Sequence, residues 1–122
     1  MTTYRETFWK IKLDSCKEAL TKNNFEVFIA DNLQQARTIF FEDILPGLHV
    51  KTVSWGDSLT FHSTGILDEL RKNKRVSIVE TFADNISREE IIERRRQALL
   101  VDLFFTGSNS VTEKGQLVNL DM

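Results

Sequence analysis

The feature that most constrains the fold of this 122-residue chain is the alternation of helical and strand-like segments along its length. Segments with apolar residues at helical spacing are each followed by a short run rich in β-branched and aromatic residues. No glycine-, serine- or proline-rich linker divides them. The pattern predicts one α/β domain, residues 1–122, with a parallel sheet and helices on both faces. The expected strands cover residues 25–29, 50–55, 75–79 and 101–105.

Capping signals place the ends of the expected helices. The first helix covers residues 3–22, and the second is capped by Asp31 or Asn32 and stopped at Pro46. The third covers about residues 59–72. The fourth opens at a capping box formed by Ser87 and Glu90 and runs to about residue 99.

The last part of the chain predicts an antiparallel hairpin. After the strand at 101–105 comes a run of small polar residues and then a tight turn around residues 113–115, flanked by Val111, Leu117 and Val118. The second hairpin strand is expected to end at Asp121, and the sequence stops one residue later at Met122. No helix follows in this sequence to cover that strand. We therefore expect the sheet to be incomplete at this end.

Composition excludes several classes of function. A formal net charge of −2 and a pI near 5.7 give no basic face for nucleic acid. The single cysteine, Cys16, lies on the apolar face of the first helix, where we expect core packing; it can form neither an internal disulfide nor a four-cysteine zinc or iron–sulfur site. His49 and His62 are too far apart in sequence to predict a metal site. With no secretory signal or membrane span in the sequence, we expect a cytoplasmic protein.

Two polar loops are the candidate ligand site, because each follows a strand and parallel strands end at one rim of their sheet. Glycine and helix-start amides in the first loop suit an anion, and hydroxyls with an amide in the second suit a sugar or nucleotide ester. Ordinary turn and cap roles remain open for both loops. The candidate binding residues are Gly56, Asp57, Ser58, Thr106, Gly107, Asn109 and Thr112.

Two charged features accompany these loops. Glu113 is the candidate catalytic residue, as a base or nucleophile, and a solvated turn residue is the alternative. The run Arg94, Arg95 and Arg96 spreads around a helix, so at most one or two of these side chains can reach an anion at the rim. The others are expected to be solvated or paired with neighbouring glutamates.

Residues 53–58, 93–99 and 102–119 resemble the lactate-utilisation (LUD) domain family, whose members include the lactate-utilisation proteins B and C. The third segment is the most specific, and the likeness extends over essentially the whole chain. The first loop of the family often reads Gly-Gly-Ser, where this chain has Gly56, Asp57 and Ser58. Family members normally continue past residue 122, so the resemblance implies a fragment or a shortened member.

The resemblance implies a fold like that of ribose-5-phosphate isomerase and the CoA transferases. It also implies a role in the bacterial oxidation of lactate to pyruvate, beside iron–sulfur partner subunits. The iron–sulfur clusters are assigned to those partners because this chain has no ligands for such a cluster. The cofactor is unknown. Three functions stay open: an accessory domain that binds an anionic small molecule, an isomerase- or CoA-transferase-like enzyme that uses Glu113, and a non-catalytic assembly subunit that forms a homodimer.

Overall fold

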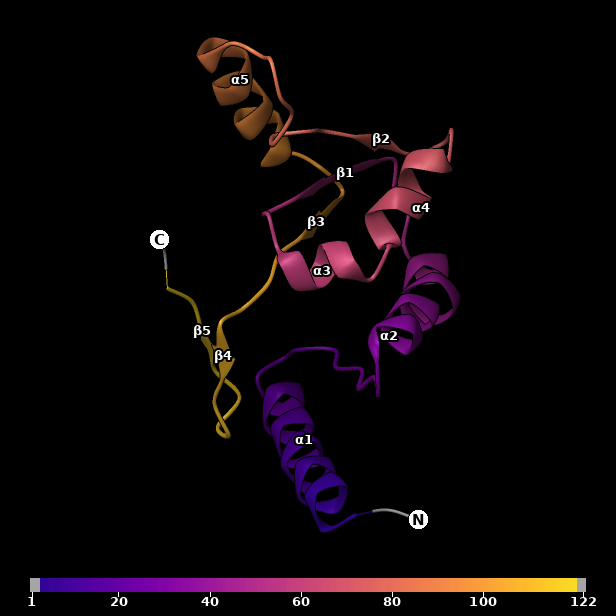
Figure 1. The fold of residues 1–122 in the computed structure, drawn as a ribbon, viewed down its shortest axis with the longest axis vertical. Coiled ribbons are helices and arrows are strands. Elements are labelled where there is room, and N and C mark those ends of the chain that lie inside the picture. The colour runs from indigo at the N-terminus through magenta and orange to yellow at the C-terminus, as the bar shows by residue number, and fades with distance from the viewer. Residues whose placement is uncertain (1–2, 121–122) are drawn as a thin grey trace. The chain divides into compact units, whose positions relative to one another are not determined.

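The computed structural model describes residues 3–120, which form two compact units (Figure 1). One unit contains the residues up to 30 together with those from 108 onward, and the other contains residues 31–107. The expected end of the fold after Asp121 lies outside the described residues. The single domain over residues 1–122 stays a prediction.

The unit of residues 31–107 is built on a three-stranded parallel sheet, which confirms the predicted α/β class. Its strands are β1 (Thr52–Trp55), β2 (Ser77–Ile78) and β3 (Leu103–Phe105), in the spatial order β2-β1-β3. The register aligns Val53 with Ile78 on one side and with Leu103 on the other. β2 therefore pairs with one edge of β1, and the chain later crosses to the other edge to form β3. The strands are shorter than the sequence predicted.

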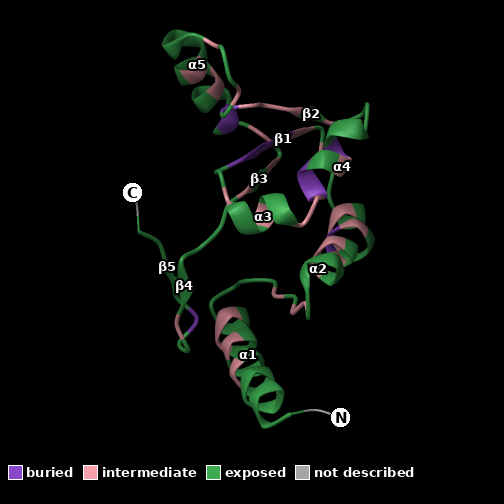
Figure 2. Cartoon of the chain, viewed as in Figure 1, coloured by how far each residue is buried: buried purple, intermediate pink, exposed green. Residues whose placement is uncertain are grey.

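Helices cover both faces of this sheet, as predicted. Val53 packs with Phe40, Ile66 and Leu70 in the buried core, and alternate residues of β3 lie against the same cluster. Side chains alternate along a strand, so Phe104 faces the other side, where it shares a groove with Ala98 of α5 (Arg88–Ala98). Figure 2 shows the buried segments concentrated on β1 and α4 (Ile66–Lys72).

The helix predicted over residues 59–72 is divided into α3 (Leu59–Ser63) and α4. Gly65 adopts a left-handed backbone with φ of 75° at the break. The hydroxyl of Thr64 donates to the carbonyl of Phe61 at 2.6 Å and accepts from the amide of Ile66 at 3.2 Å. After the break, α4 buries three apolar residues that lie on one side of its axis: Ile66, Leu67 and Leu70.

The second and fourth helices begin where the sequence predicted. Asn32, rather than Asp31, caps α2 (Leu33–Ile39), which continues through a π-turn at Phe40–Ile44 and a 3₁₀ turn at Leu45–Gly47. At the start of α5, the hydroxyl of Ser87 accepts from the amide of Glu90 at 3.1 Å. The carboxylate of Glu90 binds Arg94 at 3.0 Å, so only half of the expected capping box forms.

In the other unit, α1 (Tyr4–Lys22) confirms the first predicted helix, and β4 (Ser110–Val111) with β5 (Leu117–Val118) confirms the antiparallel hairpin. Cys16 is half-buried, as part of the contact between α1 and the hairpin. The strand predicted over residues 25–29 is wrong. Within the described chain this segment belongs to no strand, and the side chains of Val27, Phe28 and Ile29 line a groove on α1 instead.

The hairpin turn approaches α1 through a glycine. Gly115 has φ of 79°, and a Cβ placed on it would lie 2.6 Å from the backbone carbon of Ala19. The side-chain amide of Asn23 donates to the carbonyl of Gly115 at 2.8 Å. Only glycine accommodates both the backbone conformation and the close approach.

We expect Gly115→Ala to lower the free energy of local opening of the hairpin by at least about 1–2 kcal/mol. This is the cost of a left-handed alanine before the clash with α1 is added. Gly47→Ala is the matched control, because a Cβ there meets nothing within 4 Å. Hydrogen exchange at the hairpin amides measures the effect. Equal protection in both variants would contradict the assigned contact.

Asp102 joins the start of β3 to the start of β1. Its carboxylate accepts from the backbone amides of Lys51 at 2.8 Å and Thr52 at 3.0 Å, and from the Thr52 hydroxyl at 3.1 Å. These bonds, the Lys51 amide first, lower the pKa of Asp102 below its ordinary value. The ionised carboxylate is therefore the form that stabilises the sheet.

Because the folded pKa is lowered, the stabilisation by Asp102 is fully present above its unfolded pKa of about 3.9 and is lost as pH falls through the folded pKa. Carbon-detected NMR titration should give a midpoint below 3.9, and the stability difference between the wild type and Asp102→Asn should shrink over the same pH range. A midpoint at or above 3.9 would show that the bonds do not favour the charged form.

Candidate functional site

Two of the sequence-predicted loops meet at the carboxyl ends of β1 and β3. A Cβ on Gly56 would lie 3.3 Å from the hydroxyl of Thr106, and a Cβ on Gly107 would lie 2.8 Å from the hydroxyl of Ser58. The absence of side chains at the two glycines therefore lets the loops approach. Five of the predicted residues belong to this pair of loops: Gly56, Asp57, Ser58, Thr106 and Gly107.

The polar groups of these loops differ in what they can offer a ligand. The amide of Gly56 donates to the carbonyl of Phe105 at 2.8 Å, so it extends the sheet and is not available as the anion donor expected from the sequence. The hydroxyl of Ser58 accepts from the amide of Phe61 at 3.1 Å, which leaves its proton free to donate elsewhere. The hydroxyl of Thr106 makes only a long contact of 3.3 Å, to the carbonyl of Gly107.

Asp57, between Gly56 and Ser58 in the first loop, has a left-handed backbone with φ of 57°. Glycine adopts this conformation without cost, and aspartate is among the few other residues that tolerate it. Its exposed carboxylate adds a negative charge beside the loop hydroxyls. This charge opposes an anionic ligand.

The other three predicted residues lie in the unit that contains the hairpin, and each has a local partner. The side-chain oxygen of Asn109 accepts from the amide of Leu120 at 2.8 Å. The Thr112 hydroxyl accepts from the amide of Gln116 at 3.0 Å across the hairpin turn. Glu113 forms an ion pair with Lys12 of α1. These contacts hold the hairpin together and dock it on α1.

A groove of about 400 Å³ opens beside the same rim, and the sequence did not predict it. It lies where β1 and β2 end, against α5 and the outward face of β3. Its lining is mainly apolar and includes one cation. The lining residues are Trp55, Gly56, Thr81, Phe82, Arg95, Ala98, Leu99, Val101 and Phe104.

The three consecutive arginines of α5 have different surroundings. Arg94 binds the carboxylate of Glu90 and donates to the carbonyl of Glu80, each at 3.0 Å. Arg96 lies 3.6 Å from Glu93. Within residues 3–120, Arg95 has no carboxylate partner, and it lines the groove. This outcome agrees with the expectation that at most one or two of the three reach the rim.

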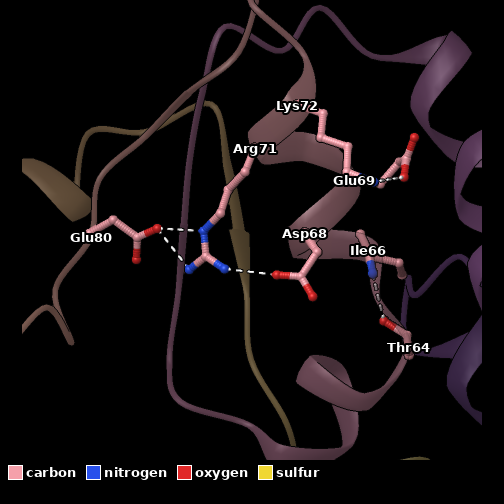
Figure 3. A network of polar contacts seen from close by, with 7 residues as sticks. All are labelled: Thr64, Ile66, Asp68, Glu69, Arg71, Lys72 and Glu80. Atoms are coloured by element: carbon pink, nitrogen blue, oxygen red, sulfur yellow. Dashed lines mark hydrogen bonds and ion pairs between the residues drawn. The ribbon is translucent and has the colours of Figure 1, made fainter.

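Glu80, a carboxylate adjacent in sequence to the groove lining, is already neutralised. Glu80, which precedes Thr81, contacts Arg71 through two guanidinium nitrogens, each at 2.8 Å, and Asp68 holds the same arginine at 2.9 Å (Figure 3). The hydrogen bond to Glu80 is the main reason that the pKa of Arg71 is raised above its ordinary value. Glu80 is thus directed toward α4.

Aromatic rings form one wall of the groove. The Trp55 ring stacks on His62, with centroids 5.9 Å apart, and meets the edge of Phe82 at 5.6 Å. Its indole Nε1 is buried and has no acceptor among the described residues. Because that nitrogen has no accessible surface, Trp55 contributes a rigid wall rather than a donor to a ligand.

Within residues 3–120, no cluster of three or more histidine, cysteine, aspartate or glutamate side chains has the geometry to hold a metal ion. Over the same residues, no helix is both long and apolar enough to span a bilayer.

Comparison with known proteins gives one match. The family model described as the LUD domain matches residues 13–122. No curated protein and no solved structure matches the chain significantly.

The contact between the two loops can be tested by pairing substitutions. We expect Gly107→Ala to lower the free energy of unfolding by about 1–3 kcal/mol, because the new methyl overlaps the Ser58 hydroxyl. In a Ser58→Gly background, which removes the overlapping atoms, the same substitution should cost clearly less. Urea unfolding of the four proteins measures the difference, and equal costs in both backgrounds would show that the loops do not touch.

Proposed function

This chain belongs to the LUD domain family, and from that premise we propose that it serves bacterial lactate and organic-acid utilisation by binding a small carboxylate at the rim of its sheet. The family is associated with lactate-utilisation proteins. The observation that carries the proposal is the match to the LUD domain model over residues 13–122. The close approach of the 56–58 and 106–107 loops supplies a place for the ligand.

Within this proposal, the hydroxyl groups of Ser58 and Thr106 donate hydrogen bonds to the carboxylate of the ligand. Gly56 and Gly107 keep the space between the loops open. Hydrogen bonds to a charged group contribute about 1.5–3 kcal/mol each. Asp57 lowers the affinity through repulsion, which keeps binding weak and readily reversible.

The Glu113 carboxylate is not part of this minimal site. It is engaged in the ion pair with Lys12 that docks the hairpin on α1. The enzymatic alternative therefore needs its own evidence, such as a glutamyl–CoA adduct that is lost in Glu113→Gln. The oxidation of lactate itself is assigned in this proposal to iron–sulfur partner subunits.

Calorimetric titration with L-lactate and pyruvate tests the proposal. We expect Ser58→Ala and Thr106→Val each to weaken binding about ten-fold or more, since each removes a hydrogen bond to a charge. Asp57→Asn should strengthen binding, because it removes the repelling charge without altering side-chain size.

Ser63→Ala is the matched control, since its hydroxyl donates to the carbonyl of Leu59 within α3 and lies outside the two loops. Its affinity should equal that of the wild type. The proposal fails if neither acid binds the wild type at millimolar concentration, or if the loop variants bind as well as Ser63→Ala.

A further inference from the structure

The groove beside α5 differs in chemistry from the two hydroxyl-bearing loops. Phe82, Leu99 and Phe104 are its large apolar side chains, and they are 45%, 85% and 49% exposed. Leaving such side chains in water is unfavourable by about 25 cal/mol for each Å² of apolar surface. A ligand that covers them with apolar atoms therefore gains free energy.

The same groove has one positive charge that no carboxylate of the described residues neutralises. Arg94 and Arg96 are held by Glu90 and Glu93, while Arg95 lines the groove without a carboxylate partner in the described part of the chain. The carboxylate of Glu80, next in sequence to the groove residue Thr81, is bound to Arg71 of α4, as Figure 3 shows. The groove thus combines an apolar lining with one arginine whose charge no carboxylate of residues 3–120 neutralises.

We propose that this groove binds an organic monocarboxylate with an extended apolar body, whose carboxylate pairs with Arg95 and whose body lies against Phe82, Leu99 and Phe104. One cation complements one negative charge, and a guanidinium binds a carboxylate through two parallel hydrogen bonds. A three-carbon acid would fill little of the roughly 400 Å³ and would leave the apolar wall in water. The site thus selects for a longer acid than lactate, and it does not depend on the proposed function.

Octanoate is the probe, with octanol as its neutral counterpart and acetate and butyrate as shorter acids. Calorimetry should show affinity rising about three- to four-fold per methylene group from butyrate to octanoate, as expected for burial of the chain. Arg95→Met keeps the apolar stem but removes the charge, and it should weaken octanoate binding about ten-fold while leaving octanol binding unchanged. Arg96→Met is the matched control and should bind octanoate as the wild type does.

Amide NMR spectra of the wild type locate the bound acid. Octanoate should shift the amides of Thr81, Phe82, Ala98 and Val101 at the groove. The inference is overturned if affinity does not rise with chain length, if Arg95→Met binds octanoate like Arg96→Met, or if the shifts lie elsewhere. Failure of this inference is distinguishable from failure of the proposed lactate site, because lactate binding to the wild-type protein is measured in a separate titration.

Discussion

The structure of the sheet-containing unit depends on the burial of β1 between its two neighbours. Val53 and Ser54 point to opposite faces, and both are completely buried. Val53 meets the apolar core, whereas the hydroxyl of Ser54 is satisfied by the carbonyl of Val79 at 2.9 Å. A strand paired on both edges and covered on both faces has little freedom to move, so the residues that follow it are held in place.

That constraint places two chemically different surfaces at one rim. The chain leaves β1 at Trp55 and Gly56, which lie beside the end of β3 on one side and beside the segment after β2 on the other. The β3 side presents hydroxyls and glycines, as suits a small polar anion. The β2 side presents aromatic and aliphatic surface with Arg95, as suits a larger amphipathic acid. A member of the LUD family with both features could distinguish organic acids by the size of their apolar part.

Local sequence signals predicted the elements whose determinants are close in sequence. The caps at Asn32 and Ser87, the end of the second helix at Pro46 and the hairpin around residues 113–115 are formed by neighbouring residues, and all were located correctly. The strand expected over residues 25–29 failed because strand formation needs a partner. Its composition indicated an extended apolar segment, but no strand of residues 3–120 pairs with it.

The sequence by itself determined the α/β class, the starts of the capped helices, the two polar loops and the family, since periodicity, capping and motif are all local properties. Only the tertiary structure decided which groups are available to a ligand. The Gly56 amide donates to Phe105, Glu80 pairs with Arg71, and Glu113 pairs with Lys12, whereas Arg95 has no carboxylate partner among residues 3–120. Each of these partners comes from a different element, so their pairing depends on how the chain folds back on itself rather than on its local pattern.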